Sequence, residues 1–217
     1  MMVSLLFIIG LMGLFFYTKR GSIIPAVDLP TTEIIEPLFC GLMAILPKGV
    51  AMEVWNAYDF NRNILPYLLV RGEPVPKGQF HLCVNVLVRH EDGDILVMRR
   101  SASKPLYPGY YEFGAGGSVL AHESSLVAAH RELEEETGLV PDSMELFEKR
   151  TEVADQCHFD YYLALVSCDK TSISYQEGET DGHIWLPVSQ LSDFIESHPC
   201  FKHQKQILRR LIKRLHS

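Results

Sequence analysis

The sequence predicts an α/β protein of the α+β kind, a sandwich in which a mixed β-sheet lies between helices. Two observations predict it. Short apolar runs of strand length alternate irregularly with helical patterns along the chain. The most regular helical pattern, residues 125–137, stands near the middle of the chain, so strands precede and follow it. A chain of 217 residues has room for one domain of ordinary size and an extension.

The extension begins with Met1–Tyr17, which is almost wholly apolar and is followed by Lys19 and Arg20. This length is at the short end for a membrane span, and the charges after it place the rest of the chain in the cytoplasm by the positive-inside rule. We therefore expect residues 1–20 to form a transmembrane helix that tethers a cytoplasmic domain. The alternative is that translation begins at Met52 and the segment is not made.

Residues 21–51 are predicted to be a linker, because four prolines interrupt any long element. The globular domain is predicted to cover residues 52–217 and to open with a hairpin, followed by two strands joined by a tight turn. The strands predicted before the central helix cover residues 53–59, 64–70, 80–90 and 94–100.

A glycine-rich segment, residues 104–117, is predicted to be a loop whose backbone can approach a ligand closely. It leads to the central helix, which has Ser124 or Ser125 as its N-cap and Gly138 as its C-cap. The apolar stripe of this helix is expected to contain Leu126, Val127, Ala129, Leu133 and Thr137.

Beyond the helix, strands are predicted at residues 144–153 and 158–168. After an acidic loop, the segment 183–191 leads into a short helix. The chain closes with an amphipathic helix whose basic face is expected to be solvated. Its apolar side carries Phe201, Leu208, Leu211, Ile212 and Leu215.

Composition excludes some classes of function. The net charge of −7 and the pI near 5.7 provide no basic surface for nucleic acid, so we expect no nucleic-acid partner. The five cysteines are widely spaced and form no CxxC pair, which predicts neither a disulfide framework nor a zinc site. Such usage is typical of a reducing compartment.

Three glutamates of the central helix, Glu132, Glu135 and Glu136, share one face because they lie three and four residues apart. Their repulsion weakens the helix by roughly a few tenths of a kcal/mol per pair. A bound divalent cation would offset it, since Mg²⁺ prefers carboxylate oxygens. A solvated acidic face would be the alternative for an isolated run, but this run belongs to a longer pattern.

The pattern has nine fixed positions across the 23 residues 117–139 and resembles the Nudix box, the signature of hydrolases that act on a diphosphate linked to another moiety. The nine residues are Gly117, Glu123, Arg131, Glu132, Leu133, Glu135, Glu136, Gly138 and Leu139. The resemblance covers residues 53–217 and implies a Nudix-type α/β/α sandwich in which the box forms a loop–helix–loop metal site.

Within the family, the chain is most similar to isopentenyl-diphosphate-isomerase-like proteins, in the segments 53–63, 81–84 and 98–112. True isomerases carry a cysteine in an NTCCSHP-like segment just before the box. The corresponding residues 112–118, EFGAGGS, contain none. This departure counts against isomerisation and favours hydrolysis.

The resemblance implies roles for the box residues. Glu135 and Glu136 match the paired glutamates that bind Mg²⁺, or alternatively Mn²⁺, and Glu132 is a third ligand or the general base. The Gly117 carbonyl is a candidate contact to the metal or to water. The remaining members are expected to be structural, with an ion pair orienting the helix and a glycine ending it. These are Glu123, Arg131 and Gly138.

Other candidates lie outside the box. A further catalytic acid is expected from the loop that contains Glu177, Glu179 and Asp181, and Glu179 best matches the acid of related proteins. His122 stands where many boxes carry glycine, so strain is expected there. Three aromatic residues could contact a base or an isoprenoid, with core packing as the alternative. They are Tyr107, Tyr111 and Phe113.

Together these features predict a Mg²⁺-dependent hydrolase that cleaves a diphosphate linkage in a nucleoside diphosphate derivative or a similar small molecule. A metal-activated water would attack phosphorus. The alternatives are an isopentenyl-diphosphate-isomerase-like enzyme and a non-catalytic sensor of a nucleotide or diphosphate. The intact glutamates favour the hydrolase.

Overall fold

A computed structural model describes residues 15–17, 23–25, 53–176 and 178–215. The chain divides into two compact units, Met1–Ala51 and Met52–Ser217. In the first, strand β1 (Phe15–Tyr17) pairs antiparallel with β2 (Ile23–Pro25). The other residues of the predicted membrane helix and linker lie outside the described residues. Among those described, no helix is both long enough and apolar enough to span a bilayer.

The second unit is built on a seven-stranded sheet with the order β11-β6-β5-β10-β9, in which β7 also pairs with β6 and β8 with β5. β5 and β10 run parallel and the other pairs are antiparallel, so the sheet is mixed as the sequence predicts. The strands are β5 (His81–His90), β6 (Ile95–Arg100), β7 (Tyr111–Phe113), β8 (Ala115–Ser118), β9 (Ser143–Glu152), β10 (Cys157–Val166) and β11 (Thr180–Leu186).

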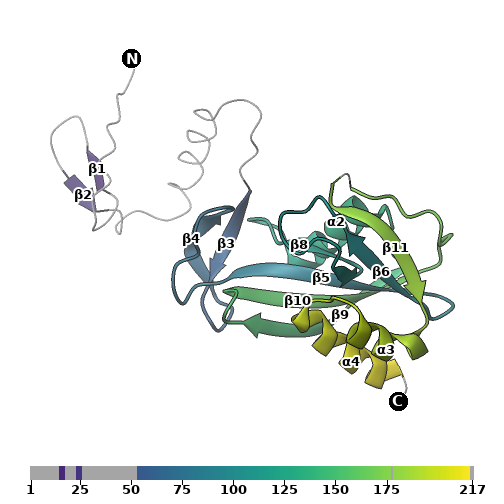
Figure 1. The fold of residues 1–217 in the computed structure, drawn as a ribbon. Helices are drawn as coiled ribbons and strands as arrows, with labels where there is room; N and C mark the ends of the chain where they lie inside the picture. The colour runs from purple at the N-terminus through teal and green to yellow at the C-terminus, as the bar shows by residue number, and fades with distance from the viewer. Residues whose placement is uncertain (1–14, 18–22, 26–52, 177, 216–217) are drawn as a thin grey trace. The chain divides into compact units, whose positions relative to one another are not determined.

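Helices cover both faces of this sheet. Figure 1 shows α2 (Ser125–Thr137) on one face and α3 (Val188–Ser197) and α4 (Lys202–Leu215) on the other. The predicted sandwich of helices around a mixed sheet is therefore confirmed. A separate hairpin, β3 (Val54–Tyr58) with β4 (Ile64–Val70), precedes the sheet and matches the predicted hairpin.

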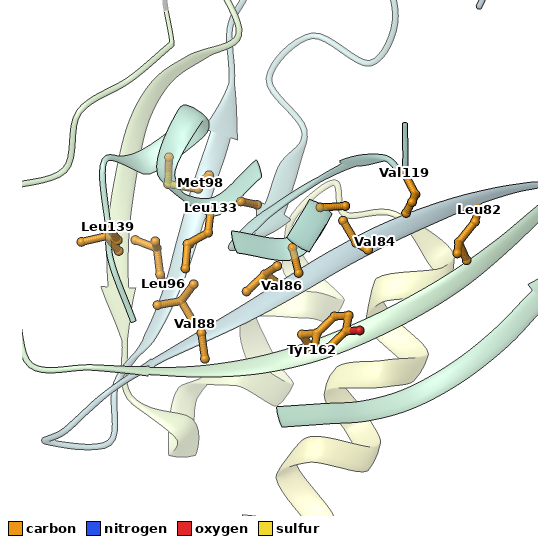
Figure 2. Packing of buried hydrophobic residues seen from close by; sticks show 14 of the residues in the cluster. Leu82, Val84, Val86, Val88, Leu96, Met98, Val119, Leu133, Leu139 and Tyr162 are labelled. Carbon is orange, nitrogen blue, oxygen red and sulfur yellow. The ribbon is translucent and has the colours of Figure 1, made fainter. Parts of the chain in front are cut away.

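Side chains alternate across the sheet, so one apolar cluster lies on each of its faces, and a third, smaller cluster of Trp55, Ala57 and Leu69 lies at the hairpin. The residues of β5 that pack on the α2 side are Leu82, Val84, Val86 and Val88. Figure 2 shows them in one layer with Leu96 and Met98 of β6 and with Leu133 of α2. On the other face, α3 and α4 bury Leu191, Ile195, Ile207, Leu208 and Leu211.

Helix α2 has the predicted ends. Ser124 is the N-cap and accepts a hydrogen bond from the Val127 N–H, and Gly138 ends the helix with a left-handed φ of 70°. The predicted apolar stripe is partly wrong, because Leu126 and Val127 are exposed whereas Ala128 is buried. The small side chains of Ala128 and Ala129 let the helix lie close to the sheet.

The glycine-rich segment before the box is not only a loop, as predicted, but contains β7 and β8. Gly114 makes this path feasible, since a Cβ there would collide with the Val86 carbonyl and its φ is 79°. The segment therefore pairs with β5 and β6 and brings residues 115–118 against α2.

Candidate active site

A cavity of about 460 Å³ opens where β8, α2 and the loop before β11 meet. Its wall is strongly ionic, and its carboxylates outnumber its cationic groups. The ionisable residues that line it are Glu53, Arg71, Arg100, Lys104, Glu112, Arg131, Glu132, Glu135, Glu136 and Glu179. The structure thus places Glu132, Glu135, Glu136 and Glu179, the four acids predicted to be catalytic, around one space.

Arg131 connects the box to the sheet. Its guanidinium donates to Glu123 at 2.6 Å, to Glu132 at 2.8 Å and to Glu135 at 3.2 Å, and to the Ser118 carbonyl at 3.1 Å. The Glu123 hydrogen bond is the largest cause of the raised pKa of Arg131. Arg131 and Glu123 are the residues predicted to form the structural ion pair, and this contact network fixes α2 against β8.

Two carboxyl groups of the cavity hold their protons unusually well. Burial, followed by the charges of Glu112 and Glu132, raises the pKa of Glu136 to about 8. Burial also raises the pKa of Glu132, against the opposing effect of Arg131. The Gly116 N–H donates to Glu136 at 3.1 Å and orients it. Crowded carboxyls of this kind accommodate their charges when a cation binds among them.

Gly117 leaves room for this arrangement. A Cβ at this position would overlap the Glu132 carboxylate, so any other residue would push that carboxylate away from β8. Converging oxygen donors and a backbone without a side chain suit a hard divalent cation. The residues present therefore fit the divalent metal that the resemblance implies.

Sequence reasoning missed several residues of the cavity. Glu112 receives a hydrogen bond from Arg100 at 2.6 Å, and Lys104 forms an ion pair with Glu179. The available signal was the alternation Tyr111-Glu112-Phe113, because neighbouring residues of a strand point to opposite faces. Reading the segment as a loop hid this signal.

The predicted aromatic contacts do not line the cavity. Phe113 is fully buried in the cluster under α3 and α4, and Tyr111 packs against Phe194 and His198. Tyr107 is exposed and packs edge-on against Phe201, and it does not line the cavity that holds the carboxylates. The side of β7 opposite to Glu112 faces the helices, which is why these rings are drawn into packing.

The other acids of the late loop differ in position. Asp181 pairs with Arg99 at 2.7 Å and does not line the cavity, whereas Glu177 lies outside the described residues. The arginine partner lowers the pKa of Asp181, so this carboxyl remains ionised. Of the loop acids that the structure describes, Glu179 reaches the cavity wall.

A second cavity of about 170 Å³ adjoins the first, since Glu112, Gly116 and Gly117 line both. It lies between the sheet and the start of α4, and its wall is largely aromatic and amide-bearing. Its remaining lining residues are Cys83, Val84, Asn85, Phe159, Phe201, His203 and Gln204. The site therefore has an ionic part and a less polar part, joined at β8.

Solved structures share this fold. DR0079 from Deinococcus radiodurans superposes with a TM-score of 0.61 at 19% identity, covering 73% of this chain and 98% of that one. The NUDIX domain of NrtR from Shewanella oneidensis, solved with ADP-ribose, gives a TM-score of 0.50 at 22% identity over 63% and 88% of the two chains. At such identities the likeness shows the fold alone.

Sequence relatives show the family. An uncharacterized Nudix hydrolase of Listeria monocytogenes, lmo0368, is 30% identical over 128 residues, 59% of this chain and 76% of the relative. YfcD of Escherichia coli is 31% identical over 113 residues, 52% of this chain and 62% of YfcD. The predicted isomerase-like branch is not tested by these matches and stays a prediction. The NUDIX domain model matches residues 79–211, and the chain therefore belongs to the Nudix family of hydrolases, which act on diphosphate bonds.

Proposed function

We propose that the chain is a Mg²⁺-dependent hydrolase that cleaves a diphosphate linkage in a nucleoside diphosphate derivative or a similar small molecule. The observation that carries the proposal is the ionic cavity, where box carboxylates and cationic side chains line one space. Carboxylates suit a metal, and cations suit the oxygens of a diphosphate. The cationic side chains on the cavity wall are Arg71, Arg100, Lys104 and Arg131.

Glu132, Glu135 and Glu136 would hold the cation, with the Gly117 carbonyl as a further contact. When bound, Mg²⁺ supplies charge neutralisation and lowers the pKa of a coordinated water. Mn²⁺ has the same preference for oxygen donors and is the alternative. Glu136 must lose its proton to join this set, because its pKa is raised to about 8.

The general base is proposed to be Glu132 or Glu179. Glu132 is enclosed and its pKa is raised by burial, which favours proton acceptance. Glu179 is more exposed and is tied to Lys104. A diphosphate that attracts Lys104 would release Glu179, so substrate binding itself can free this carboxylate.

The second cavity is proposed to hold the organic part of the substrate. His203 stacks on Phe159 with ring centroids 5.1 Å apart and an interplanar angle of 21°, which forms a flat aromatic wall. The amide oxygen of Asn85 is buried and has no hydrogen-bond partner among the described residues. A flat wall beside an available hydrogen-bond acceptor suits a nucleobase, which stacks and donates from its edge.

The test uses the full chain with Mg²⁺ and a panel of nucleoside diphosphate derivatives, including ADP-ribose and sugar nucleotides, and measures phosphate and nucleoside monophosphate release. Glu135→Gln should abolish turnover, as should chelation of the metal. Glu134→Gln is the matched control, because Glu134 lies on the same helix, is exposed and does not line the cavity. Equal loss in both variants would contradict the proposal.

The same assay tests the alternatives. Isopentenyl diphosphate belongs in the panel, and formation of its allylic isomer would favour the isomerase interpretation. Tight binding of one compound without cleavage would favour a sensor. The membrane tether through Met1–Tyr17, the linker at residues 21–51 and the cytoplasmic location stay predictions, which fractionation of cells that produce the full chain would test.

A further inference from the structure

Three side chains from two strands that are far apart in the sequence meet at one end of the parallel pair β5 and β10. His81 and Cys83 lie two residues apart on β5, so they point to the same face. Cys157 begins β10 and stands beside His81 in the register. The spacing of cysteines along the chain could not show this cluster, because the sheet topology creates it.

The three ligand atoms are close enough to share one ion. The His81 ring nitrogen and the two Sγ atoms all lie within 4.8 Å of one another. Around a tetrahedral zinc ion with bonds of roughly 2.3 Å to sulfur, ligand atoms are about 3.8 Å apart. Small rotamer adjustments would therefore bring the three donors to coordination distance.

The imidazole is held in place and has an unused donor atom. Trp55 stacks on His81 with ring centroids 4.6 Å apart and an interplanar angle of 21°. The His81 Nδ1 atom is buried and lacks a hydrogen-bond partner in the described part of the chain. Buried polar atoms are normally paired, so an orphaned nitrogen beside two thiols indicates a ligand.

We propose that His81, Cys83 and Cys157 form a second metal site that binds a thiophilic d¹⁰ cation such as Zn²⁺. Thiolate and imidazole donors select such ions, whereas the carboxylates of the first site select Mg²⁺. Three protein ligands leave one coordination position open. Cys83 also lines the second cavity, so the open position is expected to be reachable from there. This inference goes beyond the proposed hydrolysis and does not depend on it.

The test follows Trp55 fluorescence, because this ring touches the proposed ligand. The full chain with Trp185→Phe retains Trp55 as its one tryptophan. The reduced protein is titrated with Zn²⁺ in saturating Mg²⁺, which occupies the carboxylates. One equivalent should bind, and Cys83→Ser and Cys157→Ser should each weaken binding roughly 100-fold. Cys168→Ser, which removes a thiol outside the cluster, should leave the affinity unchanged.

Two further measurements keep the result interpretable if a serine variant folds poorly. Addition of Co²⁺ to the chain without cluster substitutions should produce sulfur-to-metal charge-transfer absorption. Saturating Zn²⁺ should protect two thiols from a thiol reagent. Unchanged zinc affinity in both serine variants, or a zinc affinity lost in Glu135→Gln, would overturn the proposal, as would full thiol reactivity in saturating Zn²⁺.

Discussion

At the scale of single residues, the site depends on the absence of a side chain at Gly117. Gly117→Ala places a Cβ against the Glu132 carboxylate and displaces this carboxylate from the proposed metal-binding set. We expect turnover to fall by roughly 10- to 100-fold, with little change in the melting temperature. Gly182→Ala is the matched control, since no atom lies within 4 Å of the position of its added Cβ. Equal activities of the two alanine variants would show that the close approach is unimportant.

At His122, in contrast, the presence of a side chain is expected to lower the stability of the fold. The strain expected in the backbone of His122 is present, because its φ of 71° lies in the left-handed region that L-residues rarely adopt. The side chain is exposed, so removing it sacrifices little packing. His122→Gly should raise the free energy of unfolding by about 0.5–1 kcal/mol. Chemical denaturation measures this free energy. A lower stability of the glycine variant would show that the imidazole makes a stabilising contact that outweighs the strain.

Single residues also mark the limit of prediction from sequence. Glu132, Glu135 and Glu136 were found because box spacing and helical periodicity agree. Glu112 and Lys104 were missed because the segment that contains them was interpreted as a loop, which hid the strand-like alternation around Glu112. Phe113 was assigned to the substrate because an aromatic residue near a motif serves packing and binding equally well, and only the strand's orientation separates the two roles.

At the scale of elements, α2 and β8 act as one unit through Arg131. Glu123 and Arg131 are largely shielded from solvent, with side-chain exposures of 14% and 25%. Glu123→Gln removes the charge but keeps an acceptor for the Leu120 N–H. We expect a loss of about 1–2 kcal/mol in the free energy of unfolding, since the partly buried guanidinium of Arg131 loses the nearest of its three carboxylate partners.

The matched control is the exposed pair of Arg209 with Glu196, whose side chains are 52% and 63% exposed. Glu196→Gln should cost less than about 0.5 kcal/mol because exposed ion pairs contribute little. A double-mutant cycle between positions 123 and 131 gives the coupling directly. A coupling energy no larger than that of the exposed pair would argue against a structural role.

The boundaries of the elements show why helix α2 was predictable and β8 was not. α2 has a cap at each end and a uniform period, so Ser125–Thr137 follows from local rules. β7 and β8 are only three and four residues long. They are strands because they pair with β6 and β5, and a local sequence pattern carries no information about such pairing. Nonlocal pairing is also what unites His81 with Cys157.

At the scale of the whole molecule, the mixed sheet separates two environments that β8 connects. The carboxylates of α2 gather on one face, and the aromatic wall formed with α4 lies on the other. α4 packs there through its buried apolar side chains, and Arg210 on its basic face pairs with Glu148 at 2.5 Å. The prediction that this basic face is only solvated is therefore wrong. The fold class could be predicted because many residues contribute to each helical or strand pattern, so a few exceptions do not change the pattern. The cavities could not be predicted, because they depend on how the helices pack against the sheet.

We expect this arrangement to couple folding, protonation and the proposed metal binding. The pKa of Glu136, about 8, is raised above its ordinary value of 4.5, so the unfolded chain releases a proton that the metal-free folded state keeps. The contribution of Glu136 to stability is therefore fully present below about pH 4.5 and is lost as the pH rises through about 8. Glu132 acts in the same direction.

Calorimetric melting between about pH 5 and pH 8 should then show three results. Without metal, stability falls as the pH rises, and Glu136→Gln removes part of that fall, gaining on the order of 3 kcal/mol at the upper end while losing hydrolysis. With Mg²⁺, the stabilisation by the metal grows with pH, by up to about tenfold in affinity per pH unit, because binding displaces a proton. Parallel pH profiles for Glu136→Gln and the unsubstituted chain would contradict this assignment, since the buried carboxyl would then not be the group that exchanges its proton for the metal.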